Sequence, residues 1–254
     1  MTEQIRMEAA CACKTGLVRA NNEDNFYFAG HILDRENHGL GEALRWSGNP
    51  GAVYAVFDGM GGEACGETAA YLAAAALRDA MARRDTEDFL TRVCLKANGD
   101  ICAYARRNRS PLMGSTAVLL AVDGDRAEIV NLGDSRAFLL RAGRMEQIST
   151  DHTDAAMLER SGAKGRKPRL TQHLGIPPEE MVIEPARRRG RVYPGDVFLL
   201  CSDGLTDMVP PEEIARLLSA PGDAAARADA LIAAALAGGG RDNVTVIVCR
   251  ILGK

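Results

Sequence analysis

Residues 53–62, VYAVFDGMGG, carry a run of apolar and aromatic side chains, then one acid, and then a stretch made almost entirely of glycine. Such an apolar run is typical of a β-strand that is buried on both faces. Asp58 would therefore stand at the end of a rigid strand, on the rim of a sheet. The glycines beyond it leave space beside the carboxylate and let backbone carbonyls approach a ligand. The stretch predicts a binding site at a strand end.

The same arrangement of acids and apolar runs recurs along the chain. Asp203-Gly204 follows VFLLCS, Asp134 follows EIVNLG, Asp242-Asn243 precedes VTVIV, and Asn22-Glu23-Asp24 precedes FYF. Carboxylates that converge on one rim repel each other unless cations lie between them. Oxygen ligands without Cys or His select hard ions such as Mg²⁺ or Mn²⁺. Two such ions can hold a water for attack on phosphorus, so the pattern favours metal-dependent phosphoryl chemistry.

The overall charge and composition narrow the function classes. The chain has 254 residues and a formal net charge of −3, which disfavours a nucleic-acid binder because such proteins need clustered positive charge. No apolar run reaches the roughly 20 residues of a membrane helix, and the N-terminus lacks the apolar core of a signal peptide. We expect a cytoplasmic protein with no nucleic-acid or membrane partner. Cys11 and Cys13 are interpreted as thiols on a strand, with a metal or disulfide clip as the alternative.

The spacing of apolar residues predicts an α+β fold rather than alternating βαβ units. Helices are expected at 63–83, at 86–107 with Thr86 as N-cap, at 209–220 and at 223–237. Strands are expected at 115–122, 126–132 and 136–141 as an antiparallel meander with a turn at Asp123-Gly124-Asp125, and again at 192–204 and 243–252. Residues 30–51 are interpreted as a loop insertion and 153–190 as an excursion from the core. Residues 1–254 are expected to form a single domain.

Eight short segments follow one another along nearly the whole chain: RANNED (19–24), FDGMGG (57–62), GST (114–116), GDSR (133–136), DHT (151–153), LTQHLG (170–175), CSDGLTD (201–207) and GRDNVT (240–245). On these segments the chain resembles the PPM, or type-2C, family of metal-dependent protein serine/threonine phosphatases, in its bacterial branch. The resemblance implies a four-layer α-β-β-α sandwich with two central antiparallel sheets flanked by helices, and a short flap at about 153–190.

The resemblance also implies a reaction and its cofactors. A water that bridges two metal ions, Mn²⁺ or Mg²⁺, would directly attack the phosphorus of phosphoserine or phosphothreonine. A third, weaker ion would complete the site in bacterial relatives. The partners implied are phosphorylated proteins, the substrates of a serine/threonine kinase, and we expect a monomer.

Roles for single residues follow from the same resemblance. The resemblance implies that Asp58 bridges both ions, that the carbonyl of Gly59 binds the first, and that Asp203 and Asp242 bind the second. Glu23 would act through a metal-bound water, and Asp24 would support it. Asp134, together with Asp203, would bind the third ion. Arg19 would grip the substrate phosphate, with Asn243 beside it, because a planar guanidinium can bind phosphate oxygens in pairs. The catalytic set implied is Arg19, Asp58, Asp203 and Asp242. Met60 stands where many eukaryotic relatives have a histidine proposed as general acid, and methionine cannot donate that proton.

Other interpretations stay open from the residues alone. Gly133-Asp134-Ser135 could present a serine nucleophile with His152 or His173 as base. A catalytically silent metal-binding regulatory module would keep the fold without turnover. A two-metal nuclease is disfavoured by the acidic charge and the lack of interleaved aromatic residues. The basic residues at 164–169 and 187–191 form either a landing surface for phosphorylated segments or a solvated face.

Overall fold

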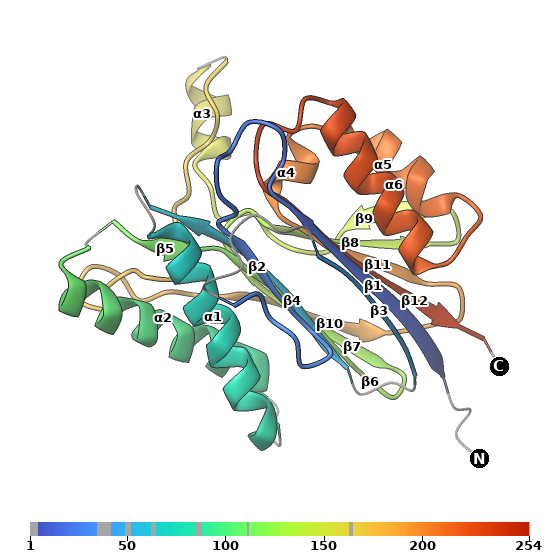
Figure 1. Cartoon of the computed structure of the whole chain (residues 1–254), viewed down its shortest axis with the longest axis horizontal. Helices are drawn as coiled ribbons and strands as arrows, with labels where there is room; N and C mark the ends of the chain where they lie inside the picture. Colours follow the sequence, from blue (N-terminus) through green and yellow to red (C-terminus); the bar gives the residue numbers. More distant parts are fainter. Residues whose placement is uncertain are drawn as a thin grey trace.

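The computed structural model describes residues 5–34, 42–48, 52–61, 65–84, 88–110, 112–162 and 165–253. Two antiparallel sheets form the centre of the molecule (Figure 1). The first has the strand order β3-β1-β12-β11-β8-β9, and the second β10-β7-β6-β4-β2, with β5 paired to β4. The strands of the first sheet are β1 (Arg6–Lys14), β3 (Glu42–Gly48), β8 (Arg136–Arg141), β9 (Arg144–Gln147), β11 (Val197–Cys201) and β12 (Val244–Leu252). Those of the second are β2 (Asp24–Phe28), β4 (Val53–Met60), β5 (Gly114–Ser115), β6 (Ala117–Asp123), β7 (Arg126–Leu132) and β10 (Ala186–Arg191).

Helices cover the outer face of each sheet (Figure 1). The second sheet is covered by α1 (Gly66–Ala80), the 3₁₀ turn η1 (Met81–Arg83) and α2 (Phe89–Asn108). The first is covered by α5 (Pro211–Ser219) and α6 (Ala224–Ala237). The single turn α4 (Asp203–Thr206) follows β11, and α3 (Ala155–Ser161) projects beyond the sheets. This arrangement confirms the predicted α-β-β-α sandwich.

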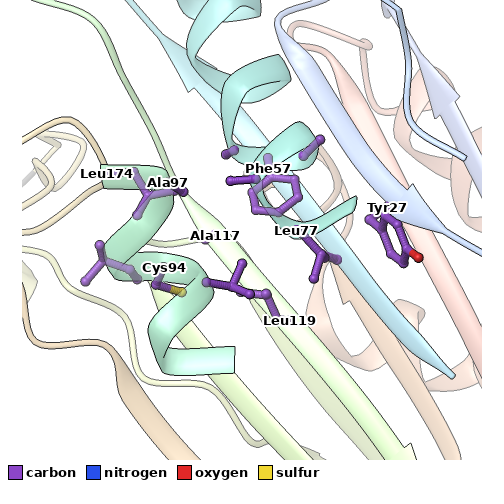
Figure 2. Packing of buried hydrophobic residues seen from close by; sticks show 14 of the residues in the cluster. Tyr27, Phe57, Leu77, Cys94, Ala97, Ala117, Leu119 and Leu174 are labelled. Atoms are coloured by element: carbon purple, nitrogen blue, oxygen red, sulfur yellow. The ribbon is translucent and has the colours of Figure 1, made fainter. Parts of the chain in front are cut away.

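The strands divide their side chains between two cores because successive side chains point to opposite faces. In β4, Val53, Ala55 and Phe57 face the helices, whereas Tyr54 and Val56 face the other sheet. Figure 2 shows the core on the helix side, which includes Phe57 of β4 and Leu77 of α1. The alanine-rich sequence of α1 has a structural purpose, since small buried side chains let the helix pack closely on the sheet.

Two predictions about how the strands are connected are wrong. Residues 30–51 are not only a loop, because β3 lies within them and pairs with β1 at the sheet edge. The meander holds for β6 and β7, but β8 pairs with β11 and β9 in the other sheet. The chain crosses between sheets at Gly133, whose φ is +99° and where a Cβ would lie 2.8 Å from the Thr116 side chain. A local apolar pattern predicts a strand but not which sheet it joins.

The polar excursion also ends earlier than expected. Its last residues form β10, which pairs with β7 along one edge of the second sheet. Short polar edge strands lack the apolar alternation that marks buried ones, because most of their side chains face solvent. Thr86, the predicted N-cap, lies outside the described residues.

Candidate active site

The acids meet because their strands present them to the gap between the two sheets. Asp58 continues the face of Tyr54 and Val56 in β4, and Asp24 continues the face of Phe26 in β2. Ser202 extends β11 with the same alternation. Strands from both sheets therefore end in polar side chains at one end of the inter-sheet core. The sandwich itself brings together residues that are far apart in the chain.

A cavity of about 560 Å³ opens at this end of the molecule. It is lined by predicted site residues: Arg19, Glu23, Asp58, Gly59, Asp134, Asp203, Asp242 and Asn243. Met60, Gly61, Thr116, Lys167, Pro168 and Leu170 complete the lining. Of the predicted set only Asp24 is absent from the lining. The lining includes no cysteine or histidine within the described ranges, so its chemistry is that of oxygen donors and cations.

Asp24 lies beneath the cavity floor and is 3% exposed. Its Oδ2 accepts hydrogen bonds from the hydroxyls of Ser202 and Thr245, each at 2.7 Å. Burial raises the pKa of Asp24 to about 7, although these hydrogen bonds oppose the shift. These hydrogen bonds therefore connect β2 to the end of β11 and to β12. They keep the Asp24 carboxylate buried next to the acids that line the cavity.

The acids on the cavity surface disfavour one another's charged forms. Burial raises the pKa of Asp58 well above its usual range, and the charges of Asp203, Asp24, Asp134 and Asp242 raise it further. Burial and Asp203 raise the pKa of Asp134 to about 6, against the opposing effect of Lys167. Burial also raises the pKa of Glu23. Bound cations would relieve this repulsion, so the all-oxygen donor set fits hard divalent ions.

Two side-chain cations hold the acids in the arrangement seen. Arg19 Nη2 donates to Asp242 Oδ2 at 2.7 Å. Lys167 Nζ donates to Asp203 Oδ2 at 2.6 Å and to Asp207 Oδ2 at 2.7 Å. With the side chains so placed, no three His, Cys, Asp or Glu groups in the described part of the chain stand close enough to hold one ion. Metal binding would therefore exchange these ammonium and guanidinium partners for the ion.

Asn243 positions the loop that carries Glu23. Its Oδ1 accepts from the Glu23 N–H at 2.7 Å, and its Nδ2 donates to the carbonyls of Thr15 and Asn21, each at 2.8 Å. Both ends of the amide are therefore engaged with backbone groups. The predicted contact of Asn243 with substrate phosphate would require breaking these bonds, so a positioning role fits the structure better.

Gly59 is required by close packing. A Cβ there would lie 2.1 Å from the carbonyl oxygen of Gly66 and 2.5 Å from that of Glu23. The Gly59 N–H donates to the same Glu23 carbonyl at 3.1 Å. The glycine after Asp58 thus lets α1 and the Glu23 loop approach the end of β4.

The serine-nucleophile interpretation is wrong. Ser135 is fully buried, and its hydroxyl lies 2.6 Å from the hydroxyl of Thr116. Thr116 Oγ1 also accepts from the Asp58 N–H at 3.1 Å. The pair therefore links the segments of Asp58 and Asp134 rather than presenting a reactive group. Cys11 and Cys13 are buried thiols on β1 that form no disulfide, as interpreted.

The arginines of β10 are paired with acids. Arg188 binds Glu146 at 2.8 Å and Arg189 binds Glu128 at 2.9 Å, while Arg187 binds Asp88. These partners neutralise much of the positive charge that the sequence suggested for this segment. The observation favours the solvated-face interpretation over a free basic landing surface.

Several site residues were missed by reasoning from sequence. Ser202 and Thr245 lie within recognised segments, and the strand alternation could have placed them beside Asp24. Lys167 was noted only as one of several basic residues, because its place over Asp203 depends on how the segment after α3 folds back. Asp207 likewise becomes visible only through its contact with Lys167.

Comparison with known proteins agrees with the geometry. The family model described as protein phosphatase 2C matches residues 16–164. The serine/threonine protein phosphatase PstP of Mycobacterium tuberculosis is 34% identical over 247 residues, which cover 93% of this chain and 43% of PstP. The serine/threonine phosphatase stp of Listeria monocytogenes is 28% identical, with 95% of both chains covered.

A solved structure extends the likeness to three dimensions. The catalytic domain of PstP, in complex with two manganese ions, matches with a TM-score of 0.78 and 33% identity, covering 98% of this chain and 99% of that one. This chain spans less than half the length of the complete PstP protein. The family model covers more than half of this chain, and the site residues lie in the expected order around one cavity. The chain therefore belongs to the protein phosphatase 2C family.

Proposed function

We propose that this protein is a metal-dependent serine/threonine phosphatase that hydrolyses phosphoserine and phosphothreonine. The observation that carries the proposal is the convergence of Asp58, Asp203, Asp242 and Glu23 with Arg19 on one cavity at the end of the inter-sheet core. Acids alone would indicate only a cation site. The guanidinium of Arg19 adds a group suited to phosphoryl oxygens.

Two Mn²⁺ or Mg²⁺ ions are the cofactors proposed. Asp58, the Gly59 carbonyl, Asp203 and Asp242 would hold them, with Glu23 acting through water and Asp24 in support. Asp134, with Asp203, would hold a third and weaker ion. When bound, such ions activate water and offset the charge on phosphoryl oxygens. The raised pKa values of Asp58 and Asp134 support this assignment, because both groups gain from a nearby positive charge.

The residues of this chain would bind and orient the substrate. Arg19 is half exposed at the cavity, so it can turn from Asp242 to a phosphate group. Asn243 would keep Glu23 in place through the hydrogen bonds described above. Met60 lines the cavity but has no proton to donate, so the leaving hydroxyl must be protonated by another group. In this proposal no side chain attacks the phosphorus, so no covalent phosphoenzyme forms.

The wider setting is also a proposal. Residues 1–254 would form one catalytic domain acting as a monomer in the cytoplasm on phosphorylated proteins, the products of a serine/threonine kinase. None of the helices in the described ranges combines the length and the apolar character needed to cross a bilayer.

The test is hydrolysis of p-nitrophenyl phosphate and of a phosphothreonine peptide with Mn²⁺, with Mg²⁺ and with EDTA. Asp203→Ala removes a proposed ligand, and Asp229→Ala removes an acid on α6 outside the cavity. We expect turnover that requires a divalent ion, is lost in EDTA, and falls by about 100-fold or more in Asp203→Ala alone. Calorimetric titration with Mn²⁺ should give two tighter sites and one weaker site in the wild type.

Other outcomes would redirect the assignment. Mn²⁺ binding by a folded protein without turnover of either substrate would favour the catalytically silent regulatory module. Turnover that survives EDTA would contradict the metal-dependent mechanism. A strong preference for the aryl phosphate over the peptide would argue against phosphoproteins as the substrate class.

A further inference from the structure

A second cavity lies at the opposite end of the first sheet. Its volume is about 250 Å³, and it lies where β8 ends, where β11 begins and where β12 ends, beside α5 and α6. The proposed active site lies at the other ends of the same three strands. With about 3.3 Å per residue, the stretch of β12 from Val244 to Arg250 separates the two by roughly 20 Å. Arg227 of α6 and Arg250 of β12 line this cavity together with Asp196 and Ser219.

Arg227 has buried donors without a partner. Its Nε and Nη1 atoms are enclosed and make no hydrogen bond to any of the described residues. A buried donor that is left unpaired costs about 1–3 kcal/mol, and more when the group is charged. Native structures rarely keep such groups without a reason. Two N–H donors without an acceptor, on a side chain that lines a cavity, are the arrangement expected of a site for an acceptor.

The charges around Arg227 are also unbalanced. Burial lowers the pKa of Arg227, and the neighbouring positive charge of Arg250 lowers it further, with only Glu8 acting in the opposite direction. Glu8 is already engaged, because its Oε1 accepts from Arg250 Nη1 and, at 3.0 Å, from the Ala224 N–H. Arg227 therefore shares Glu8 with Arg250, which also lies within electrostatic range of Asp223.

The other acids near the cavity are committed elsewhere. Asp196 is 2% exposed, and its two oxygens accept from Arg141 at 2.7 Å each, with a further bond from the Tyr193 N–H at 2.8 Å. Asp223 Oδ1 caps α6 through the Ala226 N–H at 2.8 Å. Neither carboxylate accepts from the Nε or Nη1 atom of Arg227, and Glu8 is the acid whose charge acts on this guanidinium, so Arg227 can still take an anionic ligand.

We propose that Arg227 and Arg250 form a binding site for a small tetrahedral oxyanion. The ligand class is a phosphate group, either free inorganic phosphate or the phosphoryl group of a phosphoserine. Guanidinium groups bind such oxygens through short, charge-assisted hydrogen bonds. Free phosphate is the product of the reaction proposed above, which makes it the first probe. The oxyanion site itself does not depend on that reaction.

The test is calorimetric titration of the full chain in EDTA with inorganic phosphate, with sulfate, with a capped phosphoserine and with chloride. Arg227→Met keeps the side-chain length but removes the donors. Arg216→Met makes the same change in charge on α5, where Arg216 pairs with exposed Glu213. Arg19→Met removes the guanidinium of the proposed active site. Thermal unfolding with and without phosphate provides a second readout.

We expect binding of one phosphate or one phosphoserine that is weakened at least about tenfold in Arg227→Met and is kept in Arg216→Met and Arg19→Met. Phosphate should raise the Tm of the wild type but not of Arg227→Met. Without phosphate, Arg227→Met should be at least as stable as the wild type, because it no longer buries unpaired donors. Which probe binds identifies the source of the oxyanion. The proposal is overturned if no probe binds, or if Arg227→Met binds as tightly as the wild type.

Discussion

Asp24 shows how one residue serves both the fold and the site. Its carboxylate is enclosed between the sheets, held by two hydroxyl groups from the first sheet, and close to the acids that line the cavity. Its pKa of about 7 lies well above the value of 3.8 for an exposed aspartate. The folded protein therefore holds a proton at Asp24 that the unfolded chain releases. Because of this difference in bound protons, the free energy of unfolding depends on pH.

The sign of the effect follows from linkage. Between about pH 4 and pH 7 the folded state binds more protons than the unfolded state, so stability falls as pH rises through this window. We expect the Tm of the protein in EDTA to be lower at pH 7.5 than at pH 5.5 by at least about 3 °C. The measurement is thermal unfolding across this pH range.

Matched variants isolate the contribution of Asp24. Asp24→Asn should reduce the fall in Tm, whereas Asp100→Asn, at an exposed acid on α2, should leave it unchanged. Added Mn²⁺ should restore stability at pH 7.5, since an ion stabilises the charged acids. A Tm that rises between pH 5.5 and 7.5 in EDTA would contradict this account of the acid cluster.

At the scale of elements, the end of β4 is shaped by close contact rather than by flexibility. The backbone of Gly59 lies against the Gly66 carbonyl at the start of α1 and against the Glu23 carbonyl. A side chain there would displace α1 or the Glu23 loop. The glycine therefore keeps both next to Asp58.

Gly59→Ala should accordingly lower the free energy of unfolding by about 2–3 kcal/mol or more. Gly99→Ala is the matched control, because Gly99 lies within α2 and a Cβ there meets nothing within 4 Å. Alanine in a helix interior is favoured over glycine, so this control should gain about 0.5–1 kcal/mol. Urea unfolding measures both. Wild-type stability in Gly59→Ala would mean that the contact around Gly59 can relax.

At the scale of the whole molecule, Lys167 connects the segment after α3 to the first sheet. Burial alone would lower the pKa of Lys167, but hydrogen bonds with Asp203 and Asp207 raise it above its usual value. The ammonium group occupies Asp203 Oδ2, one of the oxygens that would hold an ion under the function proposed above. It would therefore compete with that ion, which would link the position of the flap to metal affinity.

Removing this competitor should strengthen metal binding. We expect Lys167→Met to bind Mn²⁺ about fivefold more tightly than the wild type, which corresponds to an exposed ion pair worth about 1 kcal/mol. Lys96→Met is the control, because Lys96 forms an exposed pair with Asp100 on α2, outside the cavity. Calorimetry with Mn²⁺ gives the affinities. Unchanged or weaker binding in Lys167→Met would show that the ammonium group does not oppose the ion.

Much of the fold was readable from local pattern. The bounds of β7 and β8 agree with the predicted 126–132 and 136–141, and the predicted helix at 223–237 is α6. These segments are strongly periodic, and short-range sterics and burial set their type. The sequence did not show that β8 joins the other sheet, that β3 exists, or that β10 closes an edge. Those features depend on pairing between distant segments, which leaves no periodic signal within a few residues.

For the candidate site too, some features could be predicted from the sequence and others only from the tertiary structure. The sequence alone predicted which acids would meet, because Asp58, Asp134, Asp203 and Asp242 stand at strand ends within recognisable segments, and all four line one cavity. Only the tertiary structure decided that Asp24 lies under the floor, that Asn243 is occupied by backbone groups, and that Lys167 reaches Asp203. The tertiary structure also left Arg227 with unpaired donors beside a second cavity. The physical reason is that a strand carries its own residue to its end, whereas burial, hydrogen-bond partners and charge depend on which other segments arrive there.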